Sequence, residues 1–386
     1  MQLFTMGCTP KNSVKTQFKT SVFLFVGIIL NLVAQGVIAQ TVHGKTLLKV
    51  LDINVWSGLD YIGTLSMGEY ESDAVREKRY QALLQQIREL DPDVMGVHEA
   101  NKLPGYAKRL AEDTGCAAFY HVGVGGVRLG SVGLPWNLRE GDAILVKKKL
   151  NPEFVGRRQL SGGYVGKWIT FHFADATQVL AVRVLINGTP LYVYATHWHA
   201  SLTDAPAIMA KAELLVQSNA ARSEEYKALQ ADITAGAMWR LSEAEKTVAF
   251  IQETAGNNPY LLMGDFNAES HSKEIQALTG HNMIDTFARI NAGNPGFTWD
   301  PATNLNQQQH YLGTVPAEEN SLMAAIQAVD KTLSNRIDYI FIGPDEAIDS
   351  GQITIKDSRV VMKKIIDGVH ASDHYGIYSE LIVNSP

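Results

Sequence analysis

YLLMGDFNAES, residues 260–270, joins an apolar run to an abrupt polar corner. The first four residues are typical of a buried β-strand, and the run stops at Gly264-Asp265-Phe266-Asn267. In a strand, residues i and i+2 point to the same side. We therefore expect the carboxylate of Asp265 and the amide of Asn267 to converge on one small anionic group.

Polar side chains border four further apolar runs of the chain. VMGVHEA leads to Glu99, LYVYATHWHA contains His197, and RIDYIFI contains Asp338. The last run, ASDHYGIYSELIV, carries Asp373 and His374 where it enters a strand. Four acids, an amide and two histidines at strand ends require an explanation that packing alone does not provide.

Length and composition are those of a globular protein. The chain has 386 residues, of which 46% are hydrophobic and 19% charged, which excludes global disorder and allows one large domain or two ordinary ones. No repeat, low-complexity tract or long linker divides the chain after the N-terminal segment. Strands outnumber helices, and helices are inserted between strand pairs. We expect residues 40–386 to form a single α/β domain with a two-sheet core.

The first 39 residues have the layout of a secretory signal peptide. Lys11, Lys15 and Lys19 precede an apolar stretch over Val22–Val37, and a cleavage-type position follows at Ala39. We predict that residues 1–39 are removed and that the protein is secreted or periplasmic. A retained membrane anchor is the alternative, because the apolar run is slightly long for a signal and slightly short for a span.

The mature chain would be acidic. Without residues 1–39 it has 31 Lys and Arg against 40 Asp and Glu, a formal charge of about −9. Such a chain is a poor electrostatic partner for a polyanion unless positive charge is local or supplied by a metal. This disfavours nucleic acid as the partner.

Helical patterns are clearest in two segments. Apolar spacing predicts a helix over residues 73–90, with Asp73 as its N-cap. Residues 201–256 are helical in composition and form a predicted insertion. Within this insertion, Ser242 and Glu245 match a capping box, which predicts that its best-defined helix begins at Ser242.

Turn chemistry marks two other places. Asn187-Gly188 lies between two apolar runs and predicts a tight β-hairpin. The glycine-rich stretch Gly123–Trp136 is too irregular for a core element, and we expect a loop or loose ribbon beside the site.

The donor types indicate a hard metal ion. Carboxylate and amide oxygens without cysteine suit Mg²⁺, and Glu99 is presented directly after its strand. A zinc site needs grouped histidines or cysteines. His197 and His199 are the only close histidine pair, and strand alternation would place both on one face. Zinc is thus the weaker alternative.

Asp373 and His374 are expected to have separate functions. Adjacent residues of an extended segment point to opposite sides. A histidine held by a carboxylate can act as a general base near neutral pH, and Asp338 is available to hold His374.

Together these motifs resemble the endonuclease/exonuclease/phosphatase superfamily, which includes DNase I-like nucleases, abasic endonucleases, inositol polyphosphate 5-phosphatases and neutral sphingomyelinases. The resemblance covers residues 47–384, and its GDFN and SDH blocks are specific in combination. It rests on residues in matching order: Asn54, Glu99, His197, Asp265, Phe266, Asn267, Asp338, Ser372, Asp373 and His374. It implies a four-layer α/β/β/α sandwich with two mixed β-sheets and a metal-dependent phosphoric diester hydrolase.

The resemblance also implies a role for each residue of the metal and base groups. Glu99, helped by Asn54, resembles the ligand pair of a Mg²⁺ ion, for which Mn²⁺ or another divalent cation can substitute. Asp373 resembles a second carboxylate on the metal side. His374 resembles the general base that activates water, oriented by Asp338.

The remaining residues resemble the phosphate-binding half of the family site. Asp265 and Asn267 resemble the groups that position the nucleophile and bind the scissile phosphate. His197 resembles the histidine that contacts a phosphate oxygen and the charge that develops on it. Positioning and charge neutralisation are the main requirements of phosphoryl chemistry.

Within the superfamily, THWHA (residues 196–200) is most similar to the T-H-L-H-A block of neutral sphingomyelinases. GYVGKW near Lys167 and FTWDPATN (residues 297–304) extend this similarity. Trp198 in place of leucine and the long 201–256 insertion depart from it. The leading hypothesis is a secreted sphingomyelinase C, which acts on a phospholipid at a membrane surface and releases ceramide and phosphocholine. Leu129, Leu134 and Trp136 are candidate lipid contacts.

Three alternatives stay open. A secreted DNase I-like endonuclease would need a basic groove, for which Lys147–Lys149 and Arg157-Arg158 are the modest candidates. A phosphatase or a non-catalytic binding protein on the same fold are the others. No segment indicates an obligate protein partner.

Overall fold

The computed structural model describes residues 44–58, 71–124, 128–129, 132–133, 139–162, 164–165, 169–171, 176–310 and 321–385. The predicted signal peptide lies outside these residues, as do most of the predicted loop at 123–136 and two of its candidate lipid contacts, Leu134 and Trp136. The third candidate, Leu129, belongs to a two-residue strand. Within the described ranges, no helix is both long enough and apolar enough to cross a membrane.

Two six-stranded sheets and a small ribbon contain the strands of the described residues. The strands are β1 (Lys45–Asn54), β2 (Val94–His98), β3 (Cys116–Val124), β4 (Arg128–Leu129), β5 (Val132–Gly133), β6 (Glu140–Lys147), β7 (Glu153–Gln159), β8 (Tyr164–Val165), β9 (Ile169–Phe171), β10 (Gln178–Ile186), β11 (Thr189–His197), β12 (Tyr260–Asp265), β13 (Ile284–Asp285), β14 (Asp338–Gly343), β15 (Ile353–Val361) and β16 (Gly376–Asn384).

The helices lie between these strands in the sequence. They are α2 (Asp73–Leu90), α3 (Gly105–Thr114), α4 (Pro206–Ser218), α5 (Ser223–Ala255), α6 (Lys273–Gly280), α7 (Thr286–Ile290), α8 (Leu305–His310), α9 (Leu322–Asp330) and α10 (Glu346–Asp349).

Both large sheets are mixed. The first has the order β15-β16-β1-β2-β6-β3 and the second the order β13-β14-β12-β11-β10-β7. Each contains one parallel pair, β1 with β2 and β11 with β12, and the other neighbours are antiparallel. The carboxyl ends of two parallel strands meet at the same edge of a sheet. Two such edges therefore arise, one in each sheet.

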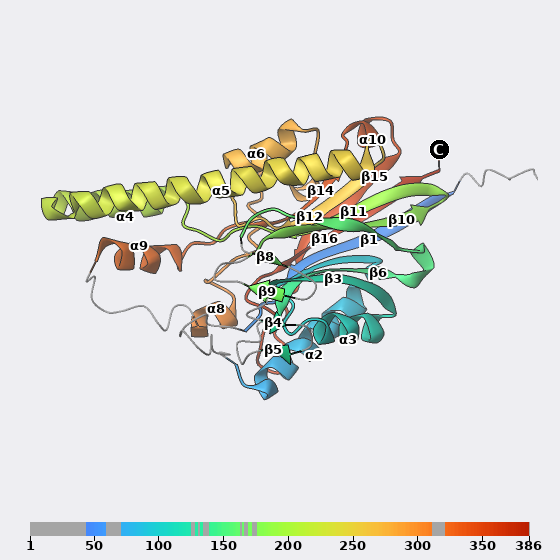
Figure 1. Ribbon diagram of the computed structural model, residues 1–386, viewed down its shortest axis with the longest axis horizontal. Coiled ribbons are helices and arrows are strands. Elements are labelled where there is room, and N and C mark those ends of the chain that lie inside the picture. Colours follow the sequence, from blue (N-terminus) through green and yellow to red (C-terminus); the bar gives the residue numbers. More distant parts are fainter. Residues whose placement is uncertain are drawn as a thin grey trace, which may run out of the picture. The chain divides into compact units, whose positions relative to one another are not determined.

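Four layers result from burial on both faces of both sheets (Figure 1). The inner faces pack on each other through residues such as Val50 and Leu261. The outer face of the first sheet packs on α2 and α3, and that of the second on α5 and α6. The predicted four-layer α/β/β/α sandwich with two mixed sheets is confirmed.

The helix over residues 73–90 is found as predicted, but its cap is not Asp73. Ser72 has extended backbone angles, and its side chain accepts a hydrogen bond from Val75 N. Asp73 is the first helical residue, where its charge lies beside the positive end of the helix dipole. The sequence pattern does not separate the two, because both residue types are good N-caps.

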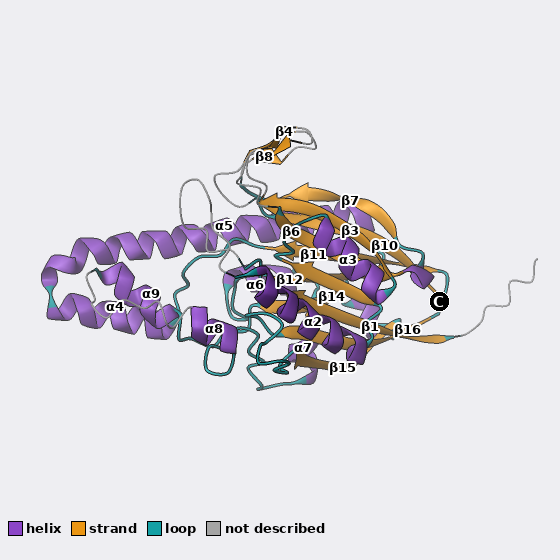
Figure 2. Cartoon of the chain, turned by 90° about the horizontal axis from the view of Figure 1, so that it is seen from below, coloured by secondary structure: helices purple, strands orange, loops and turns teal. Residues whose placement is uncertain are grey.

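The prediction that a helix begins at Ser242 is wrong. Ser242 lies inside α5, a single helix of 33 residues over Ser223–Ala255. The residues ahead of Ser242 are mostly good helix formers without proline, so nothing ends the helix there. The N-terminal half of α5 extends past the strands together with α4 and α9 (Figure 2). These three helices share a small apolar core of their own.

The hairpin prediction is confirmed. Asn187 and Gly188 connect β10 to β11 and have φ angles of 53° and 83°. Both values lie in the left-handed region that the tight hairpin turn requires, which asparagine and glycine tolerate.

We predict that Ser72→Ala lowers the free energy of unfolding by about 1 kcal/mol, because an N-terminal N–H of α2 loses its acceptor. Asp73→Ala should cost less, since only its charge near the helix terminus is lost. Urea denaturation of both variants measures the difference. A larger loss for Asp73→Ala would contradict the assignment of Ser72 as the cap.

Candidate active site

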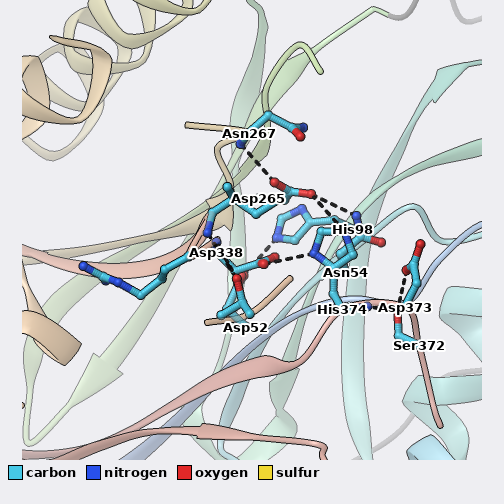
Figure 3. A network of polar contacts seen from close by, with 12 residues as sticks. Asp52, Asn54, His98, Asp265, Asn267, Asp338, Ser372, Asp373 and His374 are labelled. Atoms are coloured by element: carbon cyan, nitrogen blue, oxygen red, sulfur yellow. Dashed lines mark hydrogen bonds and ion pairs between the residues drawn. The ribbon is translucent and has the colours of Figure 1, made fainter. Parts of the chain in front are cut away.

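The eight residues predicted from the sequence meet at one end of the two sheets. Asn54 ends β1 and Glu99 follows β2, which are the parallel pair of the first sheet. In the second sheet, His197 ends β11 beside Asp265, which ends β12. Asp338 begins β14 directly opposite Asp265, because these strands are antiparallel. Asn267 follows β12, and Asp373 and His374 precede β16 of the first sheet (Figure 3).

A cleft of about 330 Å³ opens over these strand ends. Six of the eight predicted residues line it: Glu99, His197, Asp265, Asn267, Asp373 and His374. Asn54 and Asp338 are fully buried and are hydrogen-bonded to residues of the lining. A larger hollow of about 510 Å³ lies at the other end of β12, beside Tyr260 and Pro344, and contains none of the eight.

Asp265 and Asn267 converge, but through a turn and not through strand alternation. The strand ends at Asp265, and Asn267 has a φ angle of 48°. Asn267 N donates a hydrogen bond to Asp265 Oδ1 at 3.0 Å. The Asn267 amide lies 3.1 Å from His197 Nε2 and donates to the carbonyl of Trp198 at 3.0 Å. The corner is therefore rigid and joins the phosphate-side residues to one another.

Gly264 lets the two strands close at this corner. A Cβ atom at Gly264 would lie 2.2 Å from the carbonyl oxygen of Thr196 on β11. Backbone atoms cannot move away cheaply, so any side chain at this position would push β12 from β11. His197 and Asp265, which are register partners, would then separate.

His374 lies between two carboxylates. Its Nδ1 is 3.0 Å from Asp338 Oδ2, and its Nε2 is 3.8 Å from Asp265 Oδ2. Thr298 Oγ1 fixes Asp338 by accepting from its backbone N at 3.2 Å. Burial by itself lowers the pKa of His374, but the charges of Asp338 and Asp265 outweigh it and hold the pKa well above its usual value. The arrangement suits a base whose Nδ1–H is held by Asp338 and whose Nε2 faces the cleft.

His197 is the second histidine of the cleft. Its Nε2 is 3.5 Å from Asp265 Oδ2. Burial alone would lower its pKa, but the negative charges of Asp265 and Glu99 raise it overall. A positively charged imidazole here would complement an anionic phosphate oxygen.

The metal-side residues are tied together by short hydrogen bonds. The Asn54 amide donates to Glu99 Oε1 at 2.9 Å and to Asp265 Oδ2 at 3.0 Å. Its own oxygen accepts from Trp56 N at 2.9 Å. Ser57 N donates to Glu99 Oε2 at 3.0 Å. Asn54 is thus placed beside Glu99, as an amide bridge between two carboxylates, and its role as a metal ligand stays a prediction.

The donor set fits a hard divalent cation. Burial, together with the charge of Glu99, raises the pKa of Asp373 to about 6. Ligand atoms of Asp265, Asp338 and His374 lie within 4.8 Å of one another, a group that contains neither Glu99 nor Asp373, the predicted metal-side carboxylates. Asp338 Oδ1 is buried and has no hydrogen-bond partner among the described residues. Buried carboxylates in this arrangement require a counter-charge, which a divalent ion held by oxygen donors supplies.

The pairing of His197 with His199 as zinc ligands is not found. The strand ends at His197, so alternation does not continue to His199. His199 N donates to Glu243 Oε2 at 3.0 Å, and its ring stacks on Trp239 at 4.1 Å. Trp198 is buried against Phe266 at 4.6 Å. In the described part of the chain, no cluster of metal-ligating groups contains both histidines.

A buried network beneath the cleft was missed from the sequence. His98 Nε2 is 2.9 Å from Asp52 Oδ1, and its Nδ1 is 3.0 Å from Asp142 Oδ1. Burial raises the pKa of Asp52 to about 6, and the two carboxylates raise that of His98 against the effect of burial. Gly96 makes room, since a Cβ there would lie 2.4 Å from Asp52 Oδ1. Asp52 lies two residues before Asn54, and His98 lies directly before Glu99. Their closeness to predicted site residues was the sequence signal that could have indicated them.

Trp299, within the segment FTWDPATN, was not predicted as a site residue, but it lies beside the residues that were. It lines the cleft, and its ring lies 5.1 Å from that of His374 at an angle of 70°. The backbones of Trp299 and His374 form an isolated β-bridge. An aromatic ring is therefore fixed beside the candidate base.

Comparison with known proteins gives the family. The model of the Endonuclease/Exonuclease/phosphatase family matches residues 53–374, which include all eight predicted site residues. This chain belongs to that family. Membership places it among metal-dependent phosphoesterases and nucleases, as the sequence predicted. No curated protein sequence matches the chain.

Solved structures of this family share the fold. TDP2 of D. rerio in complex with a single-strand DNA product is 17% identical, with a TM-score of 0.53 and coverage of 87% of this chain and 99% of that one. The human Nocturnin catalytic domain with bound sulfate is 12% identical, with a TM-score of 0.51 and coverage of 88% and 97%. The mannosyl-6-phosphatase Bt3783 of Bacteroides thetaiotaomicron is 18% identical, with a TM-score of 0.50 and coverage of 86% and 99%. At these identities the likeness shows the fold alone.

The pKa of His374 predicts the acid limb of the pH–rate profile. A general base must be neutral, so the raised pKa means that activity increases as pH rises through it. Asp338→Asn removes the larger of the two charges that raise this pKa, so the limb should move to lower pH while kcat falls by about 10²–10⁴-fold. Rates with a soluble phosphodiester at saturating Mg²⁺ measure both. An unmoved limb would contradict the assignment.

Proposed function

We propose that this family member is a secreted, Mg²⁺-dependent phosphodiesterase of the sphingomyelinase C type, which hydrolyses sphingomyelin to ceramide and phosphocholine. The observation that carries the proposal is the charge of the cleft. Five carboxylates line it, and its described lining contains no lysine or arginine: the acids are Glu99, Glu140, Asp142, Asp265 and Asp373. Such a cleft favours a head group that carries a positive charge and disfavours a polyanion.

An aromatic ring completes a site for a quaternary ammonium group. Trp299 lines the same cleft, and quaternary ammonium ions bind to aromatic faces beside negative charge. Phosphocholine combines such a cation with the phosphodiester that the other residues would bind. This supports sphingomyelin over esters that lack a cationic group, in agreement with the similarity of THWHA to neutral sphingomyelinases.

The residues then divide the reaction between them. His374, oriented by Asp338, takes a proton from the attacking water, whose oxygen forms a bond to phosphorus as the bond to the ceramide oxygen breaks. The departing ceramide oxygen takes up a proton from solvent, so that ceramide leaves as the alcohol. Asp265 and Asn267 hold the water and the phosphate, and His197 faces a phosphate oxygen. Mg²⁺ held by Glu99, with Asn54 and Asp373 beside it, would neutralise the negative charge that develops.

Export and a lipid partner are part of the same proposal. Its support is the signal-peptide layout of residues 1–39, which would deliver the enzyme to the outer surface of membranes. Sphingomyelin is presented by such surfaces, and no obligate protein partner is needed for this reaction.

The nuclease alternative lacks its basic groove in the described part of the chain. Lys149 Nζ lies 2.8 Å from Asp93, and Arg158 forms an ion pair with Glu253. Lys147 pairs with Asp91, and burial lowers the pKa of Arg157. None of these residues lines the cleft. DNA is therefore one of the substrates to assay, and a nuclease activity is not proposed.

We expect hydrolysis of sphingomyelin in mixed micelles with Mg²⁺ and no product above background with EDTA. The same protein should be tested on phosphatidylcholine, inositol phosphates, sugar phosphates and plasmid DNA. Release of phosphocholine measures the leading activity. Absence of product from sphingomyelin above the EDTA control would refute the proposal, and salt-sensitive cleavage of plasmid DNA would establish the nuclease reading instead.

Trp299→Leu should weaken binding of choline esters selectively. Loss of a cation–π contact of about 0.5–2 kcal/mol corresponds to an increase in KM of roughly 2- to 30-fold. The substrates to compare are p-nitrophenyl phosphocholine and bis(p-nitrophenyl) phosphate, which lacks the cation. Trp299→Phe retains an aromatic face and is the matched control. Equal changes for both substrates would show that Trp299 only packs against His374.

A further inference from the structure

Arg79 of α2 is a buried guanidinium with all five N–H donors engaged. Its side chain is 4% exposed. Nε and Nη2 donate to the two oxygens of Glu71 at 2.7 and 2.6 Å. Nη1 donates to the carbonyls of Val55 and Ala371 at 2.9 and 3.1 Å, and Nη2 donates to that of Trp56 at 3.1 Å. The planar fork is thus completely satisfied.

Two of these carbonyls belong to peptide groups whose N–H donates a hydrogen bond to a residue predicted on the metal side. The Val55–Trp56 peptide accepts from Arg79, and its N–H donates to Asn54 Oδ1 at 2.9 Å. The Trp56–Ser57 peptide also accepts from Arg79, and its N–H donates to Glu99 Oε2 at 3.0 Å. Hydrogen bonds in series polarise one another. One guanidinium therefore orients both Asn54 and Glu99 through successive peptides.

The third carbonyl links Arg79 to the other side of the cleft. Ala371 precedes Ser372, whose Oγ donates to Asp373 Oδ1 at 3.1 Å and accepts from His374 N at 3.1 Å (Figure 3). The positive charge of Arg79 also acts to lower the pKa of Asp373, against the larger effect of burial. Arg79 consequently holds two segments: the one that donates a hydrogen bond to Glu99 and the one that carries Asp373.

The backbone between Val55 and Gly58 needs such an anchor. Trp56 has a φ angle of 56°, in the left-handed region that is unfavourable for a large side chain. The guanidinium carbon of Arg79 lies 4.6 Å from the centre of the Trp56 ring. Two contacts, one to the carbonyl and one to the ring, thus hold this residue in its conformation.

We propose that Arg79 is the positioning residue of the metal side of the site, which sets the directions of Glu99, Asn54 and Asp373 for a divalent cation. This inference rests on the metal-dependent function proposed above. Lysine cannot replace Arg79, because an ammonium group has three donors and no planar fork with which to join Glu71 to three carbonyls.

The test compares two buried arginine–glutamate pairs. Arg79→Lys should weaken Mn²⁺ binding, measured by calorimetry, by about 10- to 100-fold, the usual effect of losing a group that orients metal ligands. The Mg²⁺ concentration that this variant needs for half-maximal hydrolysis of bis(p-nitrophenyl) phosphate should rise in parallel. Arg240→Lys is the control: Arg240 is equally buried, and its hydrogen-bond partners are Glu274, at 3.0 Å from its Nε, and Ser201. It should lose stability and keep its affinity for Mn²⁺.

Glu71→Gln is the second variant and carries the test if Arg79→Lys does not fold. It retains one acceptor for the guanidinium, so a several-fold loss of Mn²⁺ affinity is expected. Wild-type affinity in a folded variant of either position would overturn the inference. Calorimetry needs no substrate, so inactivity towards sphingomyelin would refute only the proposed substrate. A wild-type protein that binds no Mn²⁺ would overturn both this inference and the metal-dependent function.

Discussion

Negative charge concentrated between and beside the two sheets is the constraint on which the rest of the structure depends. Two like charges about 4 Å apart repel by about 4 kcal/mol at an effective dielectric of about 20, so buried carboxylates cannot be gathered without cations. The cations that the described residues supply include His98 between Asp52 and Asp142, His374 beside Asp338, and Arg79 against Glu71. Each also fixes a group of the cleft. The charges that stabilise the site are therefore the same ones that position it.

Strand topology decides where this charge collects. Each large sheet has a single parallel pair, and the carboxyl ends of both pairs lie at the cleft. The antiparallel partner β14 starts there, which places Asp338 opposite Asp265. Five residues from distant parts of the chain meet at these strand ends: Asn54, Glu99, His197, Asp265 and Asp338. Small side chains keep the strands close, as Gly264 does between β11 and β12.

The sequence was sufficient to predict the fold and to select eight candidate residues that lie together, because apolar runs that stop at a polar residue are visible without a structure. It was insufficient where two local rules compete or where contacts are distant. Ser72 and Asp73 are equally good caps, and Ser242 matches a capping box inside an uninterrupted helix. Asn267 reaches the site through a positive φ angle that strand alternation does not anticipate. The partners of His98 are 44 and 46 residues away, so only tertiary structure reveals them.

In the function proposed here, chemistry and selectivity reside in different parts of the site. The groups that act on a phosphate ester lie on strand ends and are locked by hydrogen bonds to backbone and to one another. The walls of the cleft are lined by Glu140 and Asp142 of β6 and by Trp299 in the segment after α7. These three residues have no part in the proposed hydrolysis itself. In this cleft a bound divalent cation would attract a polyanion at one point. Carboxylates on both sides of that point would repel it. A small ester with its own cation would find complementary charge at both ends, which is why we propose a zwitterionic lipid head group over nucleic acid as the substrate.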